Sequence, residues 1–256
     1  MNIAFLASIL PVLVLLFFVY RKDKLQPEPF GKLLLTFFVG CLSVVPAIGL
    51  EMAMQLFTPA EPVAAALFDG FAVAAFCEEL CKLVLIYWVV WKSPHFDEYF
   101  DGIVYAVFLS LGFACVENIM YVFSAAEEPI IIALTRGLLA VPAHFLFAVI
   151  MGYHLALAKF DLPNRRTHLW HALLYPVLLH GTYDALLMVN DGLTKGGGNE
   201  VTVGTAVAGA LIVVFLVFDV LMWHWGIKRI KRMQERSKEQ NFDRMNPFDG
   251  FKWNVL

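Results

Sequence analysis

The run Phe76-Cys77-Glu78-Glu79-Leu80-Cys81-Lys82 decides how the chain folds, because it places three ionisable residues inside a long apolar stretch. That stretch, from about residue 63 to about residue 91, is long enough to cross the roughly 30 Å hydrocarbon core of a bilayer as a helix. A charge at the bilayer centre is costly unless protein groups or water surround it. The run therefore predicts a membrane helix whose charged side chains face the protein interior.

The composition of the whole chain supports a membrane protein. The 256 residues are 60% hydrophobic and 16% charged, and the mean hydropathy is +0.70. Soluble domains are roughly 45–50% apolar and about 25% charged, so an ordinary soluble globule is excluded. Basic residues occur only in short clusters, and this excludes a nucleic-acid-binding surface. The four cysteines lie in apolar runs and predict neither a disulfide framework nor a zinc ribbon.

Seven apolar runs are long enough to span a membrane, so we expect an all-α membrane protein of about seven transmembrane helices. The first run precedes Arg21 and Lys22, the reverse of a cleavable signal peptide, and is expected to be retained. The runs cover approximately residues 3–20, 33–57, 63–91, 102–124, 130–158, 169–190 and 201–225.

Positive residues gather in alternate loops. The loops after the first, fifth and seventh runs carry clusters of lysine and arginine, and the loop after the third run carries Lys92 beside several acids. The loops after the second and fourth runs carry glutamates and no positive charge, and the loop after the sixth run carries only Lys195. The positive-inside rule therefore predicts an outside N-terminus and a cytoplasmic C-terminus. We expect a transmembrane domain over residues 1–227 and a cytoplasmic basic tail over residues 228–256, whose basic start lies against anionic lipid headgroups.

Four consecutive predicted spans place ionisable or amide side chains well inside the hydrocarbon. At 1.5 Å per residue their depths overlap in the outer half of the membrane, so one shared polar cavity would hold them at a lower cost than separate burial. Other polar residues lie nearer span ends. We expect Asp69, Asp101, Asp219, His154, His168, His171 and His224 to be structural, and Glu51 and Arg136 to be ambiguous. The deep set is Glu78, Glu79, Lys82, Glu117, Asn118, His144, His180 and Asp184.

Helical geometry arranges this deep set. Adjacent residues point about 100° apart, so only one of Glu78 and Glu79 faces the cavity, and the sequence leaves open which. Lys82 falls between them and offsets the charge of one carboxylate. His180 and Asp184 are four residues apart and share a helix face, so the carboxylate is expected to orient the imidazole.

Two chemistries and one transport function fit these residue types. Carboxylates with two histidines can activate water, with a glutamate as general base and a histidine as acid or oxyanion donor. Alternatively, His144 and His180 with Glu78 or Glu117 hold a metal ion such as zinc, although no H-E-x-x-H motif occurs. The alternative function is a proton- or ion-coupled transporter using the same buried cluster. His144 also lies on a row of small residues, which permits helix packing or leaves room for a peptide.

Several motifs in order resemble the PrsW family of intramembrane proteases, which is similar to the CAAX prenyl endopeptidases and other glutamate-dependent intramembrane proteases. The resemblance covers about residues 21 to 190. The first motif is the glutamate pair with Lys82, which matches E-E-x-x-K. The others are Pro27-Glu28-Pro29, Asp101-Gly102, Gly112-Phe113 followed by Glu117-Asn118, then Arg136, His144 and His180-Gly181-Thr182-Tyr183-Asp184.

This resemblance implies an endopeptidase in the cytoplasmic membrane of a bacterium or archaeon. It implies cleavage of a membrane-anchored protein near the outer face, with the first cut of an anti-sigma factor as the family's best-known role. By the same resemblance, Glu78 and Glu79 supply the water-activating carboxylate, and His144 and His180 complete the catalytic centre. Lys82, Glu117, Asn118 and Asp184 assist. Metal dependence and oligomeric state are left open.

Overall fold

The computed structural model describes residues 3–125, 128–195 and 203–246, and within them every regular element is a helix. The predicted all-α membrane fold is therefore confirmed. The elements are α1 (Ile3–Lys22), α2 (Phe30–Gln55), α3 (Pro62–Phe68), the π-helix η1 (Asp69–Phe76), α4 (Cys77–Val90), α5 (Asp101–Ser124), α6 (Pro129–Leu138), α7 (Ala140–Phe160), the 3-10 helix η2 (Leu162–Asn164), α8 (Arg165–Lys195) and α9 (Val203–Met245).

Six stretches of helix in the described chain are long and apolar enough to cross a membrane. They are α1, α2, α5, α6 with α7, η2 with α8, and α9. The third predicted span is also helical, but it is divided among α3, η1 and α4, so no single element in it has the length of a span. The count of seven and the orientation of the termini stay predictions.

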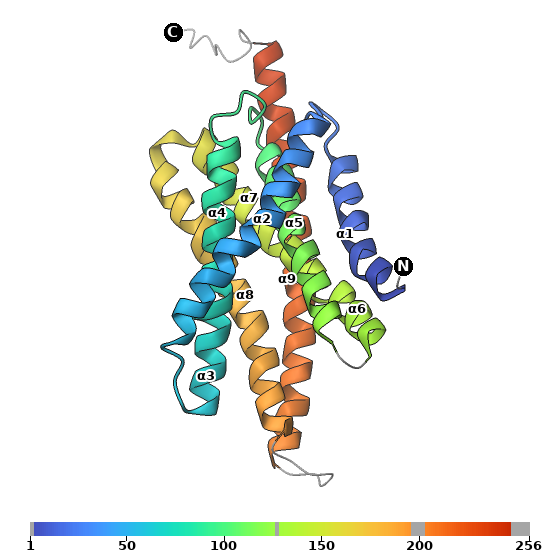
Figure 1. Cartoon of the computed structure of the whole chain (residues 1–256). Coiled ribbons are helices and arrows are strands. Elements are labelled where there is room, and N and C mark those ends of the chain that lie inside the picture. Colours follow the sequence, from blue (N-terminus) through green and yellow to red (C-terminus); the bar gives the residue numbers. More distant parts are fainter. Residues whose placement is uncertain (1–2, 126–127, 196–202, 247–256) are drawn as a thin grey trace.

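Helices α5 and α7 form the core of the bundle, and the other helices pack around them (Figure 1). Most residues of both helices are buried and apolar, which is typical of a helix packed on all faces. They approach closely at a pair of glycines. A Cβ added to Gly152 would lie 2.3 Å from the carbonyl oxygen of Gly102, so only glycine permits this backbone contact. The contact fixes the distance between the two helices.

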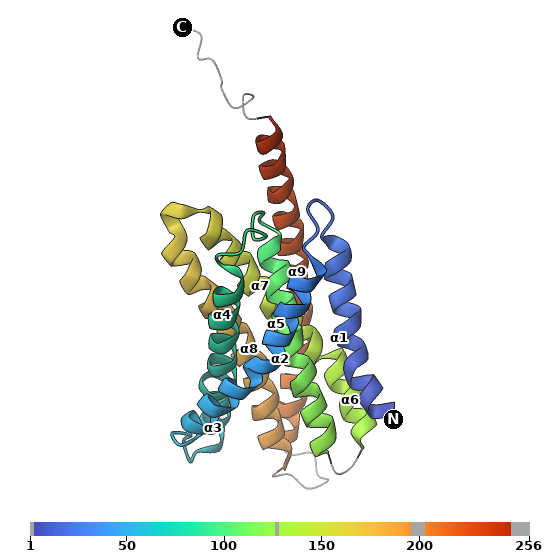
Figure 2. The same ribbon diagram turned by 45° about the horizontal axis from the view of Figure 1, so that its top comes forward.

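Alternate connections lie at opposite ends of the bundle (Figures 1 and 2). The connections α1–α2, α4–α5 and α7–α8 and the C-terminal part of α9 gather at one end, which we call the basic end. The connections α2–α3 and α5–α6, the end of α8 and the start of α9 lie at the other. Because the clusters of lysine and arginine after α1, after α7 and within α9 all fall at this end, the arrangement agrees with the alternation of charge in the sequence.

Helix α9 continues without a break across the predicted domain boundary at residues 227 and 228. Beyond the boundary it packs against the connection between α4 and α5. The backbone N–H of Phe100 donates to Ser237 Oγ at 2.9 Å, and Asn241 Nδ2 donates to Glu98 Oε2 at 2.8 Å. The first part of the polar tail is thus a helix docked on the bundle at its basic end.

Candidate active site

The ammonium group of Lys82 lies at the centre of a buried polar cluster. Its Nζ atom is 2.9 Å from Glu78 Oε2, 2.9 Å from Glu79 Oε1 and 3.3 Å from His144 Nδ1. The ring of Phe113 covers the same ammonium, with its centroid 4.0 Å from Nζ. Lys82 thus contacts both carboxylates, whereas helical geometry predicted that it would offset the charge of one.

The two adjacent glutamates face different surroundings. Glu78 lines a cavity, whereas Glu79 is fully buried and turns towards α8, where its Oε1 atom lies 3.0 Å from His180 Nδ1. The second oxygen of Glu79 has no hydrogen-bond partner among the residues that the structure describes. The structure therefore answers the question that the sequence left open: Glu78 faces the cavity, and Glu79 supports the neighbouring helix.

His180 is held between two carboxylates and an aromatic ring. Its Nε2 atom lies 3.2 Å from Asp184 Oδ2, one helical turn away, as the i,i+4 spacing predicted. The ring of Phe147 stacks on the imidazole with a centroid separation of 4.7 Å and an interplanar angle of 18°. Both ring nitrogens thus face acceptor oxygens, so His180 can donate a proton from either side.

Two glycines bring η1 against α8 and so place His180 beside the glutamates. A Cβ added to Gly70 would lie 2.9 Å from the backbone nitrogen of Ala185, and one added to Gly181 would lie 2.2 Å from Cδ1 of Phe71. Any larger side chain would push the two helices apart. Glu78 is the second residue after η1, and Glu79 follows it. This position is notable because π-helical turns occur frequently at functional sites.

A second chain of contacts orients His144. Its Nε2 atom lies 2.8 Å from Glu117 Oε2, and the other oxygen of Glu117 lies 3.0 Å from an Arg136 guanidinium nitrogen. Arg136 also donates from Nε to Asn118 Oδ1 at 3.2 Å, and the Asn118 amide nitrogen donates to the carbonyl oxygen of Ser8 at 2.7 Å. The structure therefore assigns the ambiguous Arg136 to the cluster, and it uses Asn118 to tie α1 to α5.

The cluster opens on a cavity of about 220 Å³. A neighbouring cavity of about 470 Å³ shares Glu78, Glu117 and Tyr121 with it and extends to Glu51. Tyr121 went unnoticed in the sequence because an aromatic residue in an apolar run carries no signal; its ring lies 3.8 Å from the Arg136 guanidinium carbon. The polar residues lining the first cavity are Glu78, Glu117, Tyr121, Thr135, Arg136, His144, His180, Tyr183 and Asp184.

Three members of the cluster have the donor atoms of a metal site. One ligand atom each from Glu78, Glu79 and His144 lies within 4.8 Å of the others. Carboxylate and imidazole donors suit zinc and related divalent metals. The Lys82 ammonium is within hydrogen-bonding reach of the same three groups, which shows that they can surround a cation. The residues therefore fit a metal by type and spacing, with His180 outside this group in the described chain.

Comparison with known proteins identifies the family of this chain. The family described as PrsW family intramembrane metalloprotease matches residues 28–222. The chain belongs to the PrsW family. Similar relatives are each called Protease PrsW. The Clostridioides difficile protein is 31% identical over 93% of this chain and 94% of its own length. The Geobacillus kaustophilus protein is 40% identical over 72% of this chain and 80% of its own length. The Bacillus subtilis protein is 34% identical over 91% of this chain and 97% of its own length. No solved structure matches the chain.

Membership of the PrsW family confirms that the protein is a membrane-embedded protease. Its substrates are therefore membrane-anchored proteins in the bilayer. The alternative of a proton- or ion-coupled transporter is not favoured, because the family and the named relatives are proteases. The family description also makes a bound metal plausible without naming the element.

Proposed function

We propose that the protein hydrolyses a peptide bond of a membrane-anchored protein at the cavity lined by Glu78, His144 and His180. The observation that supports this most is that the two sequence-adjacent glutamates have separate surroundings. Glu78 opens on the cavity, whereas Glu79 is locked between Lys82 and His180. A carboxylate beside a cavity, with a fixed partner behind it, is the arrangement that a general base requires.

Glu78 is the proposed general base. A water molecule in the cavity gives a proton to the Glu78 carboxylate while its oxygen forms a bond to the scissile carbonyl carbon. Lys82 holds the carboxylate in place through one oxygen, which leaves the other oxygen to face the water. Because Glu79 is fully buried and has no access to the cavity, its role is to position Lys82 and His180.

The histidines have different proposed roles after the attack. His144 and Arg136 line the cavity, and they stabilise the oxyanion that forms on the carbonyl oxygen, with the imidazole Nε2–H and the guanidinium as the donors. His180 donates a proton to the leaving nitrogen as the carbon–nitrogen bond breaks. Glu78 then passes the proton that it took from water to His180, which returns both groups to their starting states. The products are a carboxylic acid and an amine. Asn118 holds Arg136 and α1 and is a positioning residue.

A metal would be held by Glu78, Glu79 and His144 in the space that the Lys82 ammonium now fills, so Lys82 would have to move away, and Glu78 would then be a ligand rather than the general base. When bound, such an ion supplies a Lewis acid that polarises a carbonyl and lowers the pKa of a bound water. Zinc is the element that we propose, because imidazole and carboxylate oxygen are among its usual ligands.

The position of the cavity supports a cut near the outer membrane face. Glu117 lies about 10 Å from the end of α5 that is remote from the basic end, and about 24 Å from the start of α5 at the basic end, at 1.5 Å per residue. If the basic end is cytoplasmic, the reactive groups lie in the outer half. We propose a single-pass anti-sigma factor as the substrate, cut on its outward-facing side.

The test is cleavage by purified protein in liposomes. Candidate single-pass proteins encoded nearby are reconstituted with it, and fragments are identified by mass spectrometry. Removing one oxyanion or acid-base group commonly costs about 10²–10³-fold in rate. We expect at least a 100-fold loss for Glu78→Gln, His144→Ala and His180→Ala in protein that remains folded. Glu239→Gln, an exposed glutamate at the basic end, is the matched control and should cleave normally.

Two results would contradict the proposal. Near-normal cleavage by the Glu78→Gln/Glu79→Gln protein would reject the glutamate mechanism. Substrate-dependent proton or ion flux into the liposomes, with no cleavage of any membrane protein, would restore the transporter function. Elemental analysis with chelator treatment tests the metal: full activity of protein containing no metal would remove zinc from the mechanism.

A further inference from the structure

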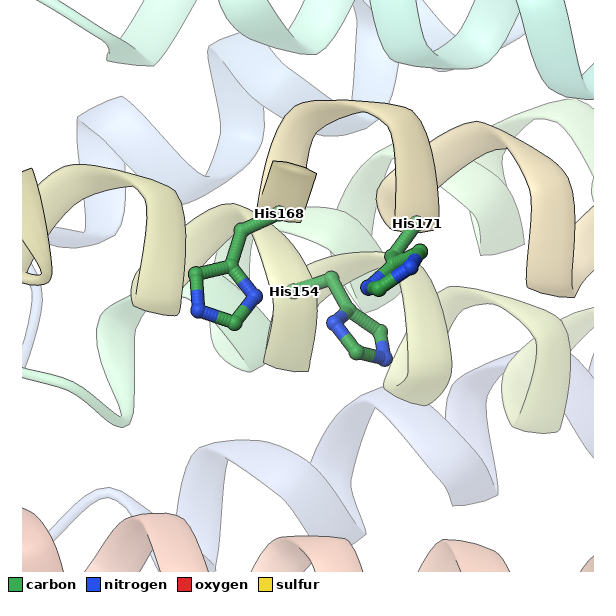
Figure 3. A group of neighbouring side chains, drawn as sticks. All are labelled: His154, His168 and His171. Atoms are coloured by element: carbon green, nitrogen blue, oxygen red, sulfur yellow. The ribbon is translucent and has the colours of Figure 1, made fainter. Parts of the chain in front are cut away.

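Three histidines form a second cluster, away from the active site, where α7 turns into α8. His154 lies on α7, and His168 and His171 lie three residues apart on α8. Figure 3 shows the three rings side by side. Their centroids are 5.3 Å apart for His154 and His171, 5.9 Å for His154 and His168, and 6.2 Å for His168 and His171. One ring nitrogen from each lies within 4.8 Å of the others.

Two of these rings have a nitrogen with no protein partner. His154 is 8% exposed, and neither its Nδ1 atom nor the Nδ1 atom of His168 has a hydrogen-bond partner in the described chain. A buried polar atom without a partner is costly and calls for an explanation. The sequence predicted structural roles for these histidines, but a ring that only packs gains nothing from an unpaired nitrogen. The unpartnered nitrogens point to a ligand.

A carboxylate fixes the tautomer that a metal requires. The Nε2 atom of His168 lies 3.3 Å from Asp161 Oδ2, at the turn between α7 and η2. When Nε2 carries the proton and donates to this acceptor, the lone pair of His168 is on Nδ1. Metal-ligating histidines commonly donate their other N–H to a carboxylate in this way. Tyr175 covers the opposite side, with its ring centroid 4.8 Å from that of His171 and 5.0 Å from that of His154.

We propose that His154, His168 and His171 bind a divalent transition metal of the zinc class, in a site separate from the active site. Three imidazoles leave one position of a tetrahedral metal open. Along α7, His154 lies about 15 Å from His144 at 1.5 Å per residue, so the two clusters cannot share an ion. A metal here joins α7 to α8, the helices that carry the two active-site histidines.

Charge around the cluster indicates what fills the fourth position. The histidines border a surface cavity of about 530 Å³ that also contains Arg229, Arg232 and Arg236 of α9. Neutral imidazoles do not balance a dication, and the arginines add positive charge. The fourth ligand is therefore an anion, either hydroxide or inorganic phosphate, and the arginines would stabilise its negative charge.

The experiment measures metal content in full-length protein purified through a tag that contains no histidine. The Lys82→Met/Glu78→Gln/Glu79→Gln background removes the carboxylates of the active-site cluster together with the ammonium that pairs with them, so that the protein keeps its fold and bound metal reports on the histidine cluster. After chelation, the protein is titrated with Zn²⁺ and gel-filtered, and Co²⁺ is used as a visible-absorption probe of four-coordinate geometry. We expect one equivalent of Zn²⁺ per chain and an increase in melting temperature with Zn²⁺.

Matched histidine variants in the same background decide the result. His171→Asn should weaken Zn²⁺ binding more than tenfold and abolish the Co²⁺ absorption and the thermal shift, whereas His224→Asn, at an exposed histidine of α9, should change neither. His168→Asn replaces His171→Asn if that variant is not monodisperse. Asp161→Asn should weaken binding about 10–100-fold. Absence of bound Zn²⁺ in the background protein, or equal Zn²⁺ content in His171→Asn and His224→Asn, would overturn the proposal.

Discussion

Glu117 and His144 meet between α5 and α7, with the carboxylate Oε2 atom 2.8 Å from the imidazole Nε2 atom. Because the carboxylate accepts from Nε2, the lone pair of the ring is on Nδ1, where it faces the Lys82 ammonium at 3.3 Å. A glutamate on one helix thus sets the orientation and the tautomer of a histidine on the next.

Glu117→Gln is therefore expected to slow cleavage by about 10–100-fold, the usual cost of losing a partner that orients a functional histidine. The amide oxygen can still accept from His144, but the charge that pairs with Arg136 is lost. Initial cleavage rates of purified protein in liposomes measure the effect. Glu235→Gln, at an exposed position on α9, is the control. An unchanged rate would show that His144 needs no charged partner.

Lys82→Met is expected to destabilise the protein by about 3–5 kcal/mol, the usual cost of removing one partner from a buried ion pair. Glu78 and Glu79 would then face each other without the ammonium that now lies between them. Unfolding in mixed micelles measures the change. The triple variant Lys82→Met/Glu78→Gln/Glu79→Gln should recover much of the loss, because no buried charge remains. If the triple variant is no more stable than Lys82→Met, repulsion between the carboxylates is not the cause.

Gly152→Ala is expected to cost about 1–3 kcal/mol, as overpacking of a core usually does. The new methyl group would meet the backbone of α5, 2.3 Å from Gly102 O and 2.6 Å from Ile103 Cα, and neither backbone atom can swing aside. Separation of α5 from α7 should also reduce cleavage. Gly209→Ala is the control, since nothing lies within 4 Å of its added Cβ, and it should leave stability unchanged or raised by up to about 1 kcal/mol.

Acidic residues in the connection between α1 and α2 predict how stability depends on pH. Burial raises the pKa of Asp23 to about 6 and that of Glu28 to about 7. The ordinary values are 3.8 and 4.5, so between about pH 4 and 7 the folded protein holds protons that the unfolded chain has released. The stability contributed by these groups therefore falls as pH rises through that window.

The melting temperature should accordingly decrease between pH 5 and pH 7.5 more steeply in the wild type than in Asp23→Asn/Glu28→Gln. All other titrating groups are common to the two proteins, so the difference between their slopes isolates this pair. Parallel curves would show that the pair does not titrate in this range.

The sequence predicts the fold class and the composition of the cluster because burying a charge in hydrocarbon is costly. Glu78, Lys82 and His180 stand out in apolar runs for that reason, and periodicity alone placed Lys82 between the two glutamates. Arg136 was harder to assign, because a charge within two turns of a span end can also reach water. Its ion pair with Glu117 depends on how α6 turns back into the bundle, which residue spacing does not reveal.

Other features depend on tertiary contacts with no local signal. The π-helical conformation of η1 follows no residue pattern that we could identify. The docking of α9 through Ser237 depends on the backbone of a connection more than a hundred residues earlier in the chain. The sequence predicts structural roles for the three histidines at the α7–α8 turn because it gives only their depth, and depth does not show which nitrogens lack a partner.

The π-helix η1 sets the rotational phase of everything that follows it in α4. One residue more or fewer between Asp69 and Phe76 would turn the glutamates by about 100° around the helix axis. The carboxylate that now reaches the cavity would then point elsewhere, and Lys82 would leave the place where three partners meet. Chain length in this short segment is therefore as tightly constrained as the identity of the charged residues themselves, and sequence gaps should be far rarer here than in the loops of related proteases.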